Sequence, residues 1–394
     1  MKFRLAAALV LLAVVVSAFN FDTKDSRRVY KKNYQSNFAH HQRRRVEAAR
    51  SKNYAPTFPA DPISISLTIG ESKQHFDVAF TSSSDTLWVL DVSYPEVGPY
   101  VTTFDPSHSS AIEVGEFYQE TDYNIVEGKT YSDVVTIVNP SNQTFGSVFY
   151  MQTSWDDPKF DSHISGVYGF SWDPKLKDER ITVNSSSIFH LFAASPDLPR
   201  LISLAAGSDR SGILDYSVVK FGKSLNGYCQ ADPLVTLPLT YSGENKLTFE
   251  MKAFWFGDQK TNGDLSSIDP GLPLIYVAYE AYAIIESVIQ PEYDYDLELE
   301  ITSCKNRDLL DDFAFNVDGG RLHIPAFLYI IDVGLGDDRC VLAVELTSDY
   351  MTPYVFGSPL LFSYCAEWSI DDTTIQFKHY TNTFTDTRRT STNV

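Results

Sequence analysis

Two short stretches of the chain carry side chains that could do chemistry together. Thr81-Ser82-Ser83 follows an apolar strand-like segment, and Asp269-Pro270-Gly271 follows another one 188 residues further on. This separation is about half of the length that remains after the leader, and it predicts two lobes that each contribute one turn to a shared cleft, where pockets commonly form. In such a cleft Asp269 could act as a general acid or base, whereas Thr81 could only position a water molecule through its hydroxyl group.

Other chemistries find little support in the sequence. The eight histidines show no H-E-x-x-H motif or paired metal-ligand spacing, and the four cysteines show no C-x-x-C spacing, so we expect no metal site. No serine lies in a G-x-S-x-G context, and no glycine-rich phosphate loop is present, so we expect neither a serine nucleophile nor a cofactor.

Charge is divided unevenly along the chain. Residues 19–52 carry ten Lys/Arg and three Asp/Glu, a net charge of +7, whereas the chain from Asn53 onward carries 20 basic and 48 acidic residues, a net charge of −28. The acidic body argues against nucleic acid as a partner, because phosphate groups would be repelled. The basic stretch favours a segment that forms ion pairs with the body, and a solvated charge run is the alternative.

The first residues are typical of a secretory signal peptide. A basic start is followed by the apolar run Leu5–Val16 and by small residues, which predicts a signal peptide over residues 1–18 with cleavage after Ala18. A signal anchor is the alternative, and no later stretch reaches roughly 18 unbroken apolar residues, so we expect no membrane span. We interpret residues 19–53 as a basic pro-segment, in which Arg43-Arg44-Arg45 is a candidate cleavage site.

Cysteines and sequons agree with a secretory route. Four cysteines predict two disulfides, for which three connectivities are possible. Asn142 and Asn184 begin N-x-S/T sequons, which predicts glycosylation at both. We therefore expect a protein that is secreted to the extracellular space or delivered to the lysosome.

The body of the chain reads as short strands. Residues 63–67, 75–80, 131–138 and 246–254 alternate apolar and polar side chains, as half-buried strands do, and turn-forming residues separate them. Convincing helical segments are few, the better ones being residues 187–194 and 279–289. The pattern predicts a mostly β protein of two domains.

Several motifs in the same order resemble those of pepsin-like aspartic peptidases. The segment FDVAFTSSSDTLWV at residues 76–89 resembles the strand and turn that carry the family's first catalytic aspartate, and SIDPGLPLI at 267–275 resembles the second. Further similarities are SGVYGF at 165–170, YVFGSPLL at 354–361 and IQF at 375–377. Together they extend from about Asp61 to His379, and Tyr364-Cys365 is similar to the nematode branch of the family.

The resemblance implies a bilobal pepsin-like acid-protease fold, in which two β-barrel-like lobes surround a central cleft. The lobes would be residues 54–206 and 207–394. It also implies a disulfide between Cys304 and Cys340, and with it a second between Cys229 and Cys365. Tyr123 would be the tyrosine of the flap that covers the cleft.

The resemblance places Thr81 at the first catalytic aspartate and Asp269 at the second. The family's reaction needs two carboxylates that share a proton, because like charges at close range split the pKa values into one acid and one base. Thr81 cannot replace such a carboxylate, so we expect a chain without peptidase activity. Ser82 could still supply the hydroxyl group that braces the opposite lobe, whereas Pro270 could not, and Ser83 in place of a glycine would be strained if the turn needed a positive φ.

Three functions follow as alternatives. The first is an inactive peptidase homologue that binds peptide or unfolded protein in the cleft, with Ser82, Ser83, Tyr123 and Gly271 as binding residues. The second is an active acid endopeptidase with an atypical dyad, and the third is a structural protein whose cleft is filled. Asp85 and Asp77 could replace the missing carboxylate, but we interpret both as solvated. We expect a monomer whose other partner is its own pro-segment.

Overall fold

The computed structural model describes residues 62–94, 101–120, 125–138, 143–155, 164–177, 179, 182, 185–209, 211–242, 246–294, 299–347 and 351–381. Strands dominate these residues, and the expected alternation is the reason. In β1 (Ser64–Ile69) the side chains of Ile65, Leu67 and Ile69 are buried, while the polar residues between them are partly exposed. The signal peptide and the pro-segment predicted at residues 1–53 lie outside the described residues.

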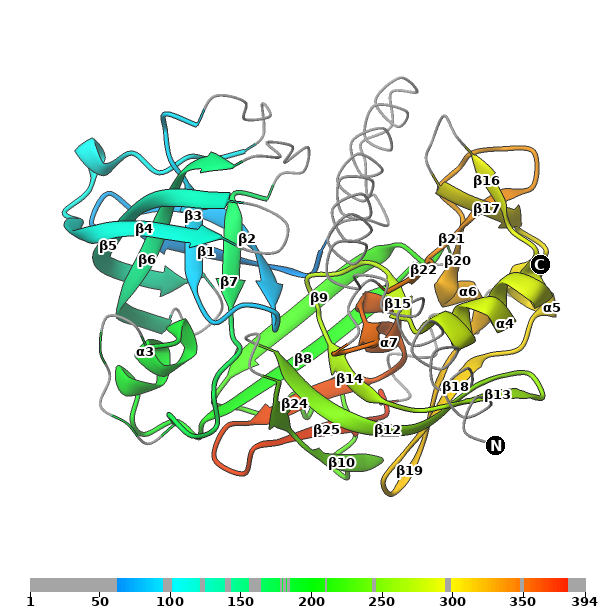
Figure 1. The fold of residues 1–394 in the computed structure, drawn as a ribbon. Helices are drawn as coiled ribbons and strands as arrows, with labels where there is room; N and C mark the ends of the chain where they lie inside the picture. Colours follow the sequence, from blue (N-terminus) through cyan, green and yellow to red (C-terminus); the bar gives the residue numbers. More distant parts are fainter. Residues whose placement is uncertain are drawn as a thin grey trace, which may run out of the picture.

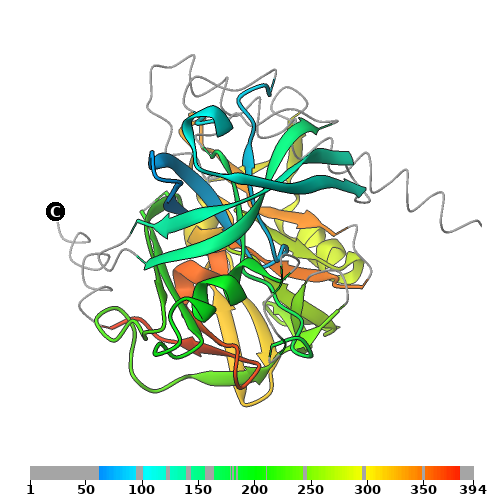
Figure 2. The ribbon, with the colours of Figure 1, turned by 90° about the vertical axis from the view of Figure 1, so that its left-hand side faces the viewer.

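A seven-stranded sheet forms the first lobe, on the left of Figure 1 and facing the viewer in Figure 2. Pairing between β1 and β5 (Ile125–Ile137), which are not neighbours in the order of strands across the sheet, curls the sheet toward a barrel. A 3₁₀ turn at Pro106–His108 and helix α3 (Ser187–Ala193) accompany it. Across the sheet the strands are β1, β2 (Gln74–Thr81), β7 (Gly166–Gly169), β3 (Leu87–Leu90), β6 (Gln143–Trp155), β5 (Ile125–Ile137) and β4 (Ile112–Glu120).

Nine- and four-stranded sheets form the second lobe, on the right of Figure 1. The larger sheet contains β19 (Gly320–Ile324), β18 (Phe313–Val317), β12 (Leu247–Phe256), β14 (Leu265–Ile268), β23 (Tyr354–Phe356), β15 (Ile275–Val277) and β22 (Val344–Leu346), with β11 (Thr240–Tyr241) and β13 (Gln259–Asn262) paired to β12. The smaller contains β16 (Glu292–Asp294), β17 (Leu299–Ser303), β21 (Arg339–Leu342) and β20 (Ile330–Ile331). The helices are α4 (Tyr279–Ile289), α5 (Asn306–Leu309), α6 (Ala326–Tyr329) and α7 (Ser358–Ser363).

A central five-stranded sheet joins the two lobes, and Figure 1 shows it in green and red between and beneath them. Its order is β10 (Val235–Pro238), β25 (Thr374–Lys378), β24 (Cys365–Ser369), β8 (Leu201–Ser208) and β9 (Leu214–Phe221). Phe170 of the first lobe packs edge-on against Trp368 of this sheet, with ring centroids 5.1 Å apart. The lobe boundary expected between residues 206 and 207 falls inside β8.

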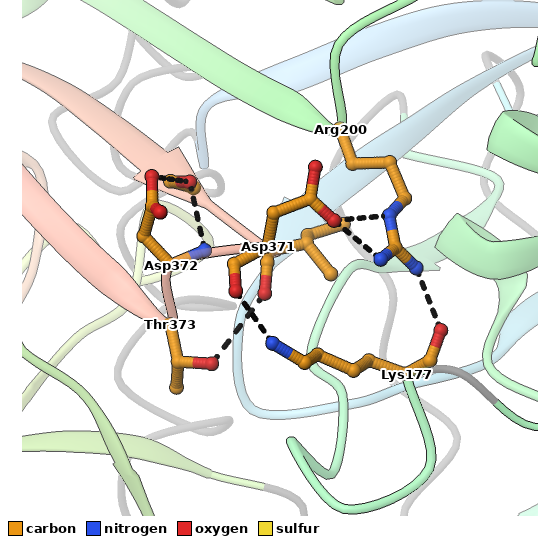
Figure 3. Close-up of polar contacts among 7 residues, drawn as sticks. Lys177, Arg200, Asp371, Asp372 and Thr373 are labelled. Carbon is orange, nitrogen blue, oxygen red and sulfur yellow. Dashed lines mark hydrogen bonds and ion pairs between the residues drawn. The ribbon is translucent and has the colours of Figure 1, made fainter.

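A polar cluster also ties the first lobe to the central sheet (Figure 3). Arg200 Nε donates to Asp371 Oδ1 at 2.6 Å, and Arg200 Nη1 donates to the backbone oxygen of Lys177 at 2.6 Å. The ammonium group of Lys177 in turn donates to the backbone oxygen of Asp371. Because Lys177 follows β7 and Asp371 lies in the turn between β24 and β25, these contacts hold the two parts together.

Two disulfides close the second half of the chain. Cys229 bonds to Cys365 and Cys304 bonds to Cys340, which is the pairing that the resemblance implied. The first links the segment before β10 to β24 of the central sheet, and the second links the end of β17 to β21. Each loop closed in this way restricts the unfolded chain and so stabilises the fold.

Candidate active site

Thr81 is the last residue of β2, and its position follows from the packing of that strand. Phe76, Val78 and Phe80 are fully buried, and Phe80 stacks on Phe170 with ring centroids 4.2 Å apart. The Phe170 N–H donates to the backbone oxygen of Thr81 at 2.9 Å. Thr81 is therefore fixed from both sides, with 6 % of its surface exposed.

Asp269 follows β14 in the second lobe and is held in the same manner. Its N–H donates to the backbone oxygen of Phe356 at 3.0 Å, and its backbone oxygen accepts from the Leu272 N–H at 3.1 Å. The Gly271 N–H donates to the carboxylate oxygen Oδ1 at 2.9 Å. A turn held by its own carboxylate results, and only 3 % of the Asp269 surface is exposed.

The two turns meet, as the sequence predicted. Thr81 Oγ1 donates to Asp269 Oδ1 at 2.7 Å across 188 residues of sequence. Beside this contact, the Ser82 hydroxyl donates to the backbone oxygen of Ile268, which is the brace to the opposite lobe that the resemblance implied for Ser82. In return the backbone oxygen of Pro270 accepts from the Ile63 N–H at 3.0 Å, a contact that does not need a side-chain hydroxyl group.

The strands around the two turns repeat one arrangement. In the first lobe β2 pairs in parallel with β7, and β7 pairs antiparallel with β3. In the second lobe β14 pairs in parallel with β23, and β23 pairs antiparallel with β15. The contacts match as well, since the Gly169 N–H donates to the Thr86 oxygen at 2.8 Å and the Gly357 N–H donates to the Leu274 oxygen at 3.0 Å. The internal repeat therefore includes the strands as well as the turns.

Gly169 and Gly357 were missed as site residues in the sequence. A Cβ atom at Gly169 would lie 2.5 Å from the backbone carbonyl of Ser84, and one at Gly357 would lie 2.2 Å from the Leu272 oxygen. Both glycines let the turn that carries Thr81 or Asp269 approach the neighbouring strand. Their signal in the sequence was their place 188 residues apart, the same spacing as that of the two turns.

Ser83 extends the contact between the turns to the surface. Its N–H donates to Thr81 Oγ1 at 3.1 Å, and its own hydroxyl oxygen lies 2.7 Å from the same atom. Ser83 is exposed, unlike Thr81 and Ser82. Among the described non-glycine residues with positive φ, Ser83 is not found, so the strain considered for a serine at this position does not arise.

Burial dominates the electrostatics of Asp269. It raises the pKa of the carboxyl group, against hydrogen bonds from Thr81, Ser83 and the Gly271 backbone that favour the charged form. Within the described part of the chain, no basic side chain pairs with Asp269 and no second carboxylate contacts it. The site therefore contains one buried carboxylate next to two hydroxyl groups.

The raised pKa gives a testable dependence of stability on pH. The folded chain holds the proton of Asp269 more tightly than the unfolded chain does. Protonation of Asp269 therefore stabilises the folded state fully at a pH below the ordinary aspartate pKa, and this contribution is lost as pH rises through the pKa that Asp269 has in the folded state. Asp269→Asn should therefore melt at a higher temperature than the parent near pH 7 and at a similar temperature near pH 3, as measured by scanning calorimetry. Exposed Asp258→Asn controls for the loss of one negative charge.

Comparison with known proteins agrees with this geometry. A family model described as eukaryotic aspartyl protease matches residues 64–380. The chain belongs to the eukaryotic aspartyl protease family. It is 23% identical to Aspartic protease 1 of Caenorhabditis elegans over 330 residues (79% of this chain, 80% of the relative) and 23% identical to Aspartic protease 17 of the same organism over 336 residues (80% and 82%). It is 26% identical to Pepsin-3 of Oryctolagus cuniculus over 289 residues (70% and 69%).

Two other carboxylates lie near the first turn of this aspartyl protease homologue, and neither contacts Asp269. Asp77 accepts a hydrogen bond from the Ser66 hydroxyl on the neighbouring strand β1. Asp85 is half-buried, its backbone oxygen accepts from the Ser187 N–H at 2.8 Å, and burial raises the pKa of its carboxyl group. Asp85, which we interpreted as solvated, is therefore only partly so, because α3 packs against this turn.

Three of the residues singled out in the sequence of this aspartyl protease homologue lie outside the described residues. These are Tyr123, the expected flap tyrosine, and the sequon residues Asn142 and Asn184. No helix among the described residues has the length and apolar character needed to cross a membrane.

The described part of this family member contains one group of side chains with the spacing of metal ligands, and it includes neither Thr81 nor Asp269. One ligand atom each from Cys304, Asp332 and Cys340 lies within 4.8 Å of the others. The two sulfur atoms are bonded to each other in a disulfide, so neither is the thiolate that binds metal ions. The group is therefore a poor metal site.

Proposed function

We propose that this chain is a secreted member of the aspartyl protease family that lacks peptidase activity and binds peptide or protein segments in the cleft between its lobes. The proposal identifies Thr81 with the position of the first catalytic aspartate and Asp269 with the second. The observation that carries it is the hydrogen bond from Thr81 to Asp269, which stands where the reaction needs two carboxylates.

The loss of activity follows from which groups can donate or accept a proton at this contact. An aspartic dyad activates water with one ionised carboxylate and polarises the scissile carbonyl with a protonated one. Here the hydroxyl group of Thr81 already donates its proton to Asp269, and it cannot accept the proton of an attacking water at ordinary pH. Asp269 alone would have to serve as both base and acid.

Binding is supported by the parts that remain. Thr81 and Asp269 still meet, Ser82 still braces the second turn, and Gly271 leaves room beside both, since a Cβ atom there would lie 3.1 Å from Thr81 Cβ and 3.1 Å from Asp269 Oδ1. An extended peptide would bind across these turns by adding its backbone as a strand. Tyr123 would cover the peptide from the flap.

The leader and the sequons complete the proposal. Residues 1–18 direct the chain into the secretory pathway, residues 19–53 form a basic pro-segment that pairs with the acidic body, and glycans are attached at Asn142 and Asn184. The mature chain works as a monomer in the extracellular space or the lysosome. Because it lacks the dyad, it depends on another protease, acting at Arg43-Arg44-Arg45, to remove its pro-segment.

Incubation with an unfolded protein tests the absence of activity. Purified chain, incubated with acid-unfolded serum albumin between pH 3 and 6, should produce no fragments on a denaturing gel, and its own pro-segment should stay attached. Cleavage by the parent that disappears in Asp269→Asn would show a mechanism with one carboxylate, and the chain would then be an active endopeptidase. Cleavage that persists in Asp269→Asn would indicate a contaminating protease, and purification would have to be repeated before judgement.

A further inference from the structure

The direction of each hydrogen bond between the two turns can be assigned by counting protons. A threonine hydroxyl group has one proton to donate and two lone pairs that accept. Thr81 Oγ1 donates its proton to the Asp269 carboxylate at 2.7 Å and accepts from the Ser83 N–H at 3.1 Å. Its third partner is Ser83 Oγ at 2.7 Å. Because the Thr81 proton goes to Asp269, the Ser83 hydroxyl group donates inward, to Thr81 or to the Asp269 carboxylate that it also contacts.

The hydroxyl groups of Thr81 and Ser83 form a hydrogen-bonded series that ends at the exposed Ser83. The direction of hydrogen bonding at this exposed end is consequently fixed. Ser83 has a single hydroxyl proton, and its two side-chain partners, Thr81 and Asp269, both lie on the inner side, so that proton points inward. Its remaining lone pairs face outward from an exposed side chain, so the surface of the site presents an acceptor. A pair of aspartates that shares one proton could both donate and accept at the same place, whereas the single Asp269 carboxylate, which accepts from Thr81, leaves only an acceptor at the outer end of the two hydroxyl groups.

The charge around the site acts in the same direction. Asp269 is buried without a basic partner in the described part of the chain, and the chain from Asn53 onward has a net charge of −28. A ligand group with a partial or full positive charge is therefore attracted to this surface, and a carbonyl oxygen is repelled.

We propose that Ser83 is the specificity-determining residue of the site and accepts a hydrogen bond from an amine or N–H group of the bound peptide. The site then selects peptides that present a donor at this position over peptides that present a carbonyl oxygen there. This inference rests on the proposed binding function, and it assigns the polarity of the ligand that the function requires.

Two hexapeptides that differ at one bond provide the test. Both have the sequence Ac-Ala-Ala-Phe-Phe-Ala-Ala-NH₂. In one the central amide is replaced by the amine –CH₂–NH–, which donates, and in the other by the ketone –CO–CH₂–, which can only accept. Calorimetric titration of the full chain at pH 7.5 should give an affinity about tenfold higher for the amine, since one hydrogen bond with charge assistance is at stake.

Variants of neighbouring serines locate the effect. Ser83→Ala should reduce the preference to about twofold or less, because the outward acceptor is lost. Ser83→Thr should retain the preference, since it keeps the hydroxyl group. Ser84→Ala is the matched control, because Ser84 is only partly exposed and its hydroxyl group contacts Thr86 at 3.1 Å and not Thr81 or Asp269. The Ser84→Ala variant should prefer the amine peptide as strongly as the parent does.

The outcomes separate the two proposals. Equal affinities in the parent, tighter binding of the ketone, or a preference that survives Ser83→Ala would each overturn the assigned polarity while leaving the peptide-binding function in place. Failure of the parent to bind either peptide at millimolar concentration would count against both proposals. Tighter binding of the amine that depends on Ser83 supports both.

Discussion

Thr81→Asp is expected to give this chain measurable peptidase activity at acid pH. The Thr81 oxygen already lies 2.7 Å from Asp269 Oδ1, so a carboxylate at position 81 would face Asp269 at the distance where two such groups share one proton. General acid–base catalysis contributes about 10²- to 10⁴-fold. Cleavage of acid-unfolded serum albumin, followed by the release of acid-soluble peptides between pH 3 and 5, should therefore rise at least about 100-fold over the parent.

Two further variants show whether a shared proton is the cause. Thr81→Asn has nearly the shape of Asp but cannot ionise, and it should stay inactive. Thr81→Asp combined with Asp269→Asn keeps one carboxylate and should also stay inactive. If Thr81→Asp folds, with a melting curve at pH 4 like that of the parent, and still cleaves nothing, then the residue at position 81 is not what prevents activity. The proline at position 270 becomes the leading explanation.

The same variant should be sensitive to neutral pH. Two carboxylates at this distance repel each other once both are ionised, and the surroundings are buried and hold no basic partner in the described residues. The folded state then binds one proton more than the unfolded state, so stability is lost as pH rises. A gain of activity at acid pH would thus be accompanied by a loss of stability at neutral pH.

Much of the fold could be predicted from alternation along the chain. The strand expected at residues 75–80 lies within β2, the one expected at 246–254 lies largely within β12, and the helix expected at 279–289 is α4 with the same ends. These segments are governed by which side chains reach the core, and this is a local property of the sequence. The meeting of Thr81 with Asp269 was predicted from the spacing of two turns.

Features that depend on the angle or contact of a distant segment could not be predicted in this way. Whether Ser83 needs a positive φ depends on the geometry of the turn, and the structure shows that it does not. The burial of Asp85 depends on α3, which begins about a hundred residues later. The lobe boundary proposed at residue 206 falls within β8, because the central sheet uses strands from both halves of the chain.

Gly357→Ala is expected to be among the most destabilising single substitutions in the second lobe. An added Cβ atom would lie 2.2 Å from the Leu272 oxygen and 2.3 Å from the Leu274 oxygen. Both are backbone atoms of the segment that follows Asp269, so neither can move aside as a flexible side chain would. Accommodating the methyl group requires β23 to separate from this segment, where the Gly357 N–H donates to Leu274.

The expected cost is about 3 kcal/mol or more, in the range of severe overpacking. For a chain of this size that corresponds to a melting temperature lower by roughly 4 °C, measured by calorimetry at pH 5. Gly169→Ala should behave alike, because its Cβ atom would lie 2.5 Å from the Ser84 carbonyl in the equivalent place of the first lobe. Gly227→Ala is the control, since no atom lies within 4 Å of the added Cβ, and it should change stability by less than about 0.5 kcal/mol. If Gly357→Ala has the same melting temperature as the Gly227→Ala control, the close approach of the two turns to their neighbouring strands is not what holds Thr81 against Asp269.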